Sequence, residues 1–288
     1  MGSSNIQGEL WGAAARDWAE IQEPLHIPVW VAMLDAAKVG QGTRLLDAGC
    51  GGGGASVLAA QRGAIVSGLD ASEALTAIAG ERAPQSDFRV GDLEELPYDA
   101  NAFDVVIAAL SVQYAANPNA ALQELKRVSK FRSYMVISTW GLPEHCEQRV
   151  VFKAVRDTLP TPPPGGGPFA LSKPGTLENL VEQAGWSVVE SNEVECPFEY
   201  KDLDTHWQAQ RSGGPIQSAI SAVGEERPLA ERTFYRGRPG VSAWRGVHPR
   251  RSRETGFFRP FRATGAFAGR WPTRSQPPRA SSLDWALR

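Results

Sequence analysis

A glycine-rich turn between a buried strand and a helix constrains this 288-residue chain more than any other feature. Leu45, Leu46 and Ala48 predict the end of a buried strand, and residues 55–62 resume at helical spacing after the glycines. Glycines have no Cβ, so the backbone can approach a ligand closely, and the free N–H groups at the start of the helix give the turn a positive edge. This strand, turn and helix therefore predict a nucleotide-binding site in an α/β fold.

Two kinds of nucleotide ligand fit this turn. Gly49, Gly51 and Gly54 satisfy the G-x-G-x-x-G pattern of dinucleotide-binding enzymes, which is a weak signal when it stands alone. Asp47 lies two residues before the first glycine, where a carboxylate would repel a pyrophosphate but suits a ligand that carries an ammonium and a sulfonium. On these residues the chain resembles the class I S-adenosylmethionine-dependent methyltransferases, whose first motif has this shape.

Two further acidic residues follow predicted strands. Asp70 ends the apolar stretch 64–69, where its carboxylate can accept hydrogen bonds from both ribose hydroxyls in either class of enzyme. Asp92 ends the next strand; the resemblance implies that it binds the adenine amino group, with the backbone of Leu93 at the ring, and the alternative is that Asp92 caps the next turn. The predicted cofactor-binding residues are Asp47, Gly49, Cys50, Gly51, Asp70, Ala71, Asp92, Leu93, Ala109 and Leu110.

The substrate class is suggested by the exit of the apolar strand 105–110. Methyltransferases that act on amino groups of bases or glutamine usually carry an Asn/Asp-Pro-Pro-aromatic tetrad here, and this chain does not. Its pattern instead resembles small-molecule members of the family, which implies that Gln113 lies beside the transferred methyl group; Trp18 and Trp140 are the other expected substrate-lining residues. His26 and His145 are candidates for a general base, although neither lies in a motif.

The resemblance implies a doubly wound, mostly parallel seven-stranded sheet in the order 3-2-1-4-5-7-6. We expect a helical N-terminal lid over residues 1–40, a cofactor-binding domain over 41–226, and a substrate-pocket insertion at about 141–185. The tryptophans of the lid either cover the cofactor or only pack on the domain. Strand seven is expected near 195–199 or in the tail. Where the family has Pro-Gly-Gly this chain has residues 131–133, Phe-Arg-Ser, so we expect local strain or a rearranged connection there.

The last 62 residues differ in composition from the rest. From residue 227 onward there are 14 Arg, no Lys and 3 acidic residues, a net charge of +11. Arg, Pro and Gly without an apolar period predict a disordered tail, a frame-shifted reading of the gene, or a nucleic-acid-binding arm. The first 226 residues carry 16 basic and 29 acidic residues, and this acidic body argues against a nucleic-acid substrate.

Composition and cysteine usage narrow the remaining classes. An apolar content of 42% is enough for a core, and the apolar runs are too short to cross a bilayer, so we expect a cytoplasmic protein without a membrane partner. Three widely spaced cysteines and four scattered histidines predict neither disulfides nor a metal site. We expect methyl transfer from S-adenosylmethionine to a small-molecule acceptor on O, N or C. The alternatives are a nicotinamide oxidoreductase and a cofactor-binding protein that has lost catalysis; the oligomeric state is left open.

Overall fold

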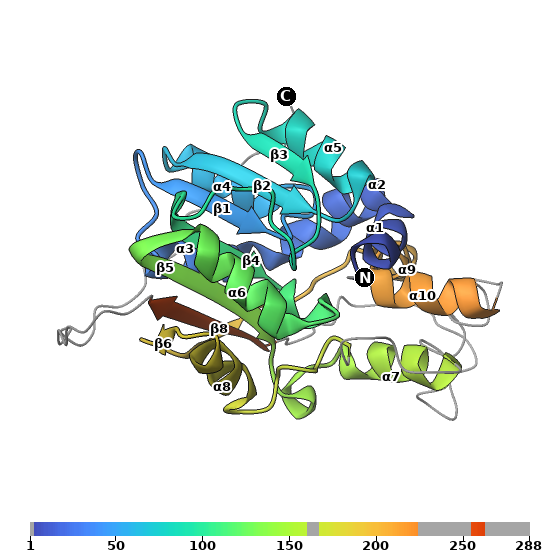
Figure 1. Ribbon diagram of the computed structural model, residues 1–288. Helices are drawn as coiled ribbons and strands as arrows, with labels where there is room; N and C mark the ends of the chain where they lie inside the picture. Colours follow the sequence, from blue (N-terminus) through green and yellow to red (C-terminus); the bar gives the residue numbers. More distant parts are fainter. Residues whose placement is uncertain (1–2, 160–166, 224–254, 263–288) are drawn as a thin grey trace, which may run out of the picture.

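An eight-stranded sheet in the order β3-β2-β1-β4-β5-β8-β6, with β7 paired to β8, forms the centre of the protein (Figure 1). This computed structural model describes residues 3–159, 167–223 and 255–262. The strands are β1 (Arg44–Ala48), β2 (Ile65–Asp70), β3 (Asp87–Val90), β4 (Phe103–Ala109), β5 (Ser129–Trp140), β6 (Ser187–Val188), β7 (Asn192–Glu195) and β8 (Thr255–Arg262).

The five strands β1 to β5 run parallel to one another. Val106 and Ile107 of β4 are fully buried, as a central strand covered on both faces requires. Since parallel strands bring their carboxyl ends to one edge of the sheet, the residues that follow β1, β2 and β4 lie close together there. The predicted cofactor residues come from these strand ends, so the topology itself assembles them.

Helices cover both faces of the sheet, as the doubly wound fold predicts (Figure 1). Apolar side chains of α6 and α8 pack on one face, and those of α3 and α4 pack on the other. The longer helices of the central domain are α3 (Ile27–Ala36), α4 (Gly54–Gln61), α5 (Glu73–Arg82), α6 (Pro118–Val128) and α8 (Thr176–Gln183). The α/β methyltransferase-like fold class expected from the sequence is therefore confirmed.

The N-terminal lid and the helices after β7 meet beside the sheet. Helix α1 contacts α10, and α9 contacts the helical turn η1, so that segments from both ends of the domain lie side by side (Figure 1). The lid elements are α1 (Ser4–Gly12), α2 (Ala15–Asp17), η1 (Trp18–Gln22) and η2 (Glu23–His26), and the helices after β7 are α9 (Leu203–Arg211) and α10 (Gly214–Val223). The remaining helical segments are η3 (Val112–Tyr114), η4 (Pro143–His145) and α7 (Arg149–Thr158). None of the described helices has the length and apolarity needed to cross a bilayer.

Strand β8 corrects two expectations: that the tail is irregular throughout and that the sheet has seven strands. It comes from the Arg-rich tail, yet it pairs antiparallel with β5 on one side and with β6 and β7 on the other, so the tail is not irregular over these residues. It occupies the position expected of strand seven, and the additional strand β7 makes the sheet eight-stranded. The composition of the tail did not predict this strand, because strand pairing requires only backbone hydrogen bonds. Without β8, the backbone N–H and C=O groups on one side of β5 would have no strand partner. The rest of the expected tail lies outside the described residues.

Backbone strain is present at residues 131–133, as the loss of the glycines predicts. Arg132 adopts φ of 64°, a left-handed conformation that costs energy for a residue with a side chain. The β4–β5 register shifts between Phe103 and Val105, and Phe131 is 70% exposed. The chain therefore continues as a strand through a distorted connection.

Candidate functional site

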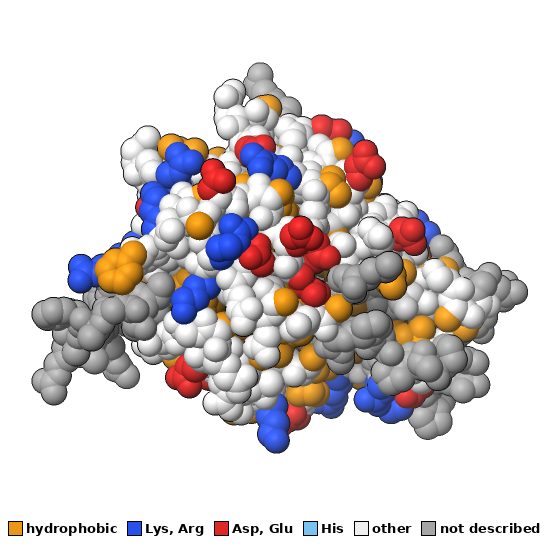
Figure 2. Space-filling view, viewed as in Figure 1, with side chains coloured by type: hydrophobic (Ala, Val, Ile, Leu, Met, Phe, Trp, Pro, Cys, Tyr) orange, Lys and Arg blue, Asp and Glu red, His pale blue; other side chains and the backbone are white. Residues whose placement is uncertain are grey.

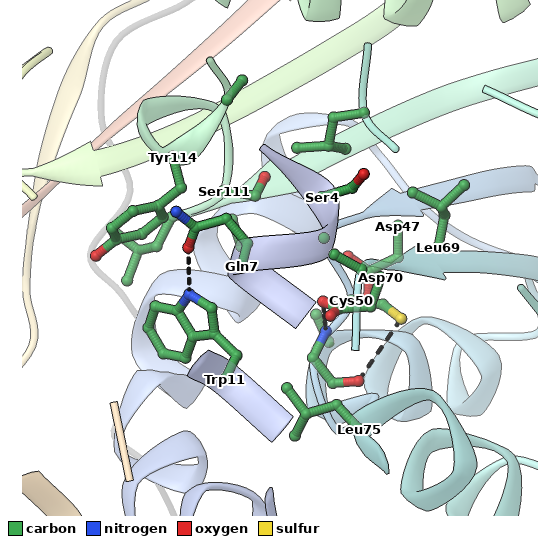
Figure 3. A pocket seen from close by; sticks show the side chains of 18 of the residues that line it. Ser4, Gln7, Trp11, Asp47, Cys50, Leu69, Asp70, Leu75, Ser111 and Tyr114 are labelled. Atoms are coloured by element: carbon green, nitrogen blue, oxygen red, sulfur yellow. Dashed lines mark hydrogen bonds between the residues drawn. The ribbon is translucent and has the colours of Figure 1, made fainter. Parts of the chain in front are cut away.

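A cavity of about 140 Å³ lies at the carboxyl ends of the parallel strands, beneath the lid. Asp47, Cys50 and Asp70 lie on one side of it, and Gln7, Trp11 and Tyr114 lie on the other (Figure 3). Asp47 belongs to a strand of the sheet, whereas Gln7 and Trp11 belong to α1 of the lid. The cavity thus forms where the sheet edge and the N-terminal helices meet.

Every predicted cofactor residue lines this cavity. Trp18 and Trp140, two of the three expected substrate-lining residues, line it as well. Their contacts with a ligand stay predictions. The lining residues taken from the prediction are Asp47, Gly49, Cys50, Gly51, Asp70, Ala71, Asp92, Leu93, Ala109 and Leu110.

The glycine turn needs glycine for steric reasons. Gly49 has φ of 84°, and a Cβ placed on it would lie 2.3 Å from the Cβ of Ser111. The Ser111 hydroxyl donates a hydrogen bond of 2.7 Å to the Ala48 carbonyl, which holds the end of β4 against the end of β1. The turn can therefore pass this close to its neighbour only without a side chain.

Asp47 is a buried carboxylate with one unused oxygen. It is 1% exposed, and its Oδ2 accepts a 2.7 Å hydrogen bond from the Ser56 hydroxyl. Its Oδ1 has no hydrogen-bond partner among the described residues. Burial is the main cause that raises the pKa of Asp47 to about 7; the Ser56 hydrogen bond opposes this rise and the nearby Asp70 carboxylate adds to it. Since burying an unpaired carboxylate oxygen is costly, this atom is suited to a cationic partner.

Asp70 holds the turn and the following helix together. Its Oδ2 accepts a hydrogen bond from the Gly51 N–H and its Oδ1 accepts one from the Ser72 N–H, both at 2.9 Å. Burial raises the pKa of this carboxyl, and the backbone donors oppose the rise. A carboxylate has about four acceptor positions, so two remain for ligand hydroxyls. At Asp92, Oδ1 accepts a hydrogen bond from the Glu94 N–H at 2.9 Å, as the capping alternative predicts, so part of this carboxylate is already used within the protein.

Glu23 is a site residue that the sequence did not single out. It belongs to the lid and is 3% exposed, yet its Oε1 accepts the Gly52 N–H at 2.7 Å. Its Oε2 pairs with the Arg82 guanidinium at 2.6 Å. Burial raises the pKa of Glu23 to about 7, although Arg82 opposes the rise. Glu23 therefore fastens the lid to the glycine turn. No local pattern marks it, because its partners are distant in sequence.

His26 lines the cavity in the middle of an aromatic cluster. Its ring lies 5.0 Å from Phe198, 5.8 Å from Trp18 and 6.0 Å from Trp30, measured between centroids. Nδ1 lies 3.3 Å from the Glu23 carbonyl oxygen and donates a hydrogen bond to it in the tautomer that carries the proton on Nδ1. Nε2 has no partner among the described residues. Burial lowers the pKa of His26 to about 4. The ring is therefore neutral and can accept a hydrogen bond.

The structure does not bring two other candidates to the site. Gln113 is fully buried and lines neither this cavity nor the larger one beside it, which corrects the expectation that it borders the substrate. The short helix η3 turns by about 120° per residue, so Tyr114 reaches the cavity while its neighbour points elsewhere. His145 is exposed on η4, away from the cavity lining. The described residues contain no His, Cys, Asp and Glu cluster able to hold a metal ion.

Comparisons with known proteins agree with this geometry. Residues 46–137 match the family model described as a methyltransferase domain. A Coxiella burnetii ubiquinone biosynthesis O-methyltransferase is 31% identical over 134 residues, which are 43% of this chain and 57% of that protein. The chain spans about half the length of the curated relatives it matches.

Solved structures share the fold at low identity. A chain in the complex of the Haloferax volcanii Trm112 methyltransferase activator with its candidate methyltransferase aligns with a TM-score of 0.59 and 18% identity, over 90% of this chain and 98% of that one. A cyclase aligns with a TM-score of 0.53 and 19% identity, over 81% of this chain and 78% of that one. The same fold is thus found in proteins described by different activities.

Proposed function

This chain belongs to the class I S-adenosylmethionine-dependent methyltransferase family over its matched residues, and on that premise we propose that it methylates a small-molecule acceptor. The bound cofactor supplies a methyl group on a sulfonium, which is a good leaving group. The chain's own residues then need to hold the two reactants in line and to keep water out, which can account for several kcal/mol of barrier lowering.

The observation that carries the proposal is the unpaired Oδ1 of Asp47 in the cavity beside the glycine turn. An ammonium group of the cofactor would satisfy it, whereas the pyrophosphate of a dinucleotide would be repelled. Asp70 would accept the ribose hydroxyls, and Asp92 with Leu93 would bind the adenine. The lid residues Trp11 and Trp18 line the same cavity, so we propose that residues 1–40 exclude water from the site.

His26 is the candidate for contact with the acceptor. Its unpaired Nε2 can accept a hydrogen bond from an acceptor hydroxyl or amine and so orient the attacking atom. A pKa of about 4 makes it a weak base, so we propose orientation as its role. Acidic side chains gather in the middle of the face shown in Figure 2, with Lys and Arg side chains beside them. The excess of 29 acidic over 16 basic residues in the first 226 residues favours a small acceptor over a nucleic acid.

A thermal-shift comparison tests the proposal against its alternatives. S-adenosylmethionine and its demethylated product are expected to raise the melting temperature of the full chain, because a ligand that binds only the native state stabilises it. NAD and NADP serve as the controls, and stabilisation by either of them alone would favour the oxidoreductase. Binding of S-adenosylmethionine without turnover of any acceptor would favour a cofactor-binding protein that has lost catalysis.

Replacing Asp70 with alanine is expected to weaken S-adenosylmethionine binding by about 1.5–3 kcal/mol, because charge-assisted hydrogen bonds to the ribose are lost. Calorimetric titration measures the change. Asp87→Ala is a matched control, because that carboxylate lies at the start of β3 and is 52% exposed. Equal affinities of the Asp70 and Asp87 variants would remove Asp70 from the site.

Cofactor affinity is expected to rise with pH through the pKa of Asp47, which burial raises to about 7. The cationic ligand binds the carboxylate form of Asp47. At a pH below that pKa, the carboxyl group must therefore release its proton when the ligand binds. From about pH 6 to about pH 7.5 the affinity should rise roughly five- to tenfold. In Asp47→Asn this contribution disappears. Glu23 also lines the cavity and has a pKa raised to about 7, so a smaller pH dependence from its titration is expected to remain. Titrations in two buffers of different ionisation enthalpy measure the released proton, and an unchanged pH dependence in the variant would contradict the assignment.

A further inference from the structure

A second and larger cavity, of about 490 Å³, adjoins the first. Gln7 and Tyr114 line both cavities, so these two side chains form the wall between them. Figure 3 shows them together on the side of the first cavity away from Asp47. Gln7 accepts a 3.0 Å hydrogen bond from the Trp11 indole, and the Trp11 and Tyr114 rings meet edge to face at 5.4 Å. A molecule in the second cavity would therefore lie next to the first one.

The interior of the second cavity is apolar. Its walls come from α7, α10, the lid and the residues at 167–169. Phe152 and Phe169 form one wall, with ring centroids 5.4 Å apart, and Trp140 of the first cavity packs against both. Leu159 and Val155 add aliphatic surface. Such a lining binds the ring or hydrocarbon part of a ligand through burial of apolar area.

The rim of the second cavity is cationic. Arg149, Lys153 and Arg156 follow one another at the i, i+4 and i+7 positions of α7, so they lie along one face of that helix. No Asp or Glu is found among the described lining residues. Asp157 pairs with Lys153 and lies 3.9 Å from Arg156, which offsets part of this charge. Arg149 donates to the backbone carbonyls of Pro143 and Glu144, at 3.2 and 2.8 Å, and these neutral groups leave its charge in place.

From this arrangement we infer that the second cavity binds the methyl acceptor, and that the acceptor is an apolar molecule carrying an anionic group such as a carboxylate, sulfonate or phosphate. The apolar body lies between Phe152 and Phe169, the anion lies at the α7 rim, and the reacting end points past Gln7 and Tyr114 toward the first cavity. The identification of the occupant as acceptor rests on the proposed function, whereas the chemistry of the cavity does not.

Two fluorescent probes with the same skeleton test the chemistry. Anilinonaphthalenesulfonate is apolar and anionic, and phenylnaphthylamine is its uncharged counterpart. In the full chain, the double variant Arg149→Gln with Arg156→Gln should weaken binding of the sulfonate by about threefold to tenfold, because each exposed charge contributes little alone. Binding of the uncharged probe should stay within about twofold. Salt should weaken binding of the sulfonate only.

Matched variants distinguish probe binding in this cavity from nonspecific attraction to the protein's charge and from binding to apolar surface elsewhere. Arg132→Gln removes an exposed cation from β5 that is not among the lining residues, and should leave both probes unaffected. Ser218→Trp places a large side chain from α10 into the cavity and should abolish binding of both probes. Equal effects of the α7 and Arg132 variants, or unchanged binding in Ser218→Trp, would overturn the inference.

Titration of S-adenosylmethionine in the same variants keeps the two proposals apart. Its affinity should be unchanged in all of them, since none of these residues lines the first cavity. Probe binding that follows the expected pattern without S-adenosylmethionine binding would contradict the proposed function alone. The reverse result would contradict only the inference about the acceptor.

Discussion

Glu23→Ala is expected to lower the free energy of unfolding by about 2–4 kcal/mol, because it breaks a buried charge pair and leaves a backbone donor without its acceptor. The Glu23 side chain is 4% exposed, and it joins the Gly52 N–H at 2.7 Å to the Arg82 guanidinium at 2.6 Å. Arg82 keeps hydrogen bonds to the carbonyls of Gly52 and Ala19, at 2.9 and 2.6 Å, which limits the loss. Urea unfolding followed by tryptophan fluorescence measures it.

Glu20→Ala is the matched control for this prediction. Glu20 lies on the same segment of the lid, is 64% exposed, and approaches Arg16 only to 3.9 Å, so its loss should change stability by less than about 0.5 kcal/mol. Glu23→Gln retains an acceptor for the Gly52 N–H and should recover part of the stability. If Glu23→Ala and Glu20→Ala unfold at the same urea concentration, Glu23 does not fasten the lid to the turn.

Ending the chain at Glu226 is expected to destabilise the protein by an amount comparable to a typical domain's whole stability, about 5–15 kcal/mol. This truncation removes β8, which pairs with β5 from Tyr134 to Trp140 and is also the partner of β6 and β7. The loss would make β5 an edge strand, although Met135, Val136 and Ile137 are fully buried. Thermal unfolding and soluble yield measure the effect.

A chain ending at Arg262 provides the control, because it retains β8 and removes only later residues. It should unfold at the temperature of the full chain. Molecules of the Glu226 chain that remain folded should still bind S-adenosylmethionine, since the described lining of the first cavity contains no residue beyond Trp140. Equal stability of the two truncated chains would mean that β8 is dispensable, and would support the frame-shifted reading of the tail.

Much of the first cavity could be predicted because its determinants are local. Asp47, the glycine turn and Asp70 lie at the ends of strands that short apolar runs identify, and parallel pairing brings those ends to one edge whatever the loops do. Asp92 was predicted in the same way, because it follows the end of β3. A residue's position relative to a strand end is thus readable from neighbours a few places away.

Contacts between distant segments were not readable in this way. Glu23 reaches the glycine turn through the path of the lid, and Tyr114 replaces Gln113 at the cavity because of one short helical turn. The α7 cations become a rim only because α7 packs against α10 beside the lid. Strand β8 is the strongest case. Its place in the sheet depends on the open edge of β5, a backbone property that appears only once the other strands have assembled.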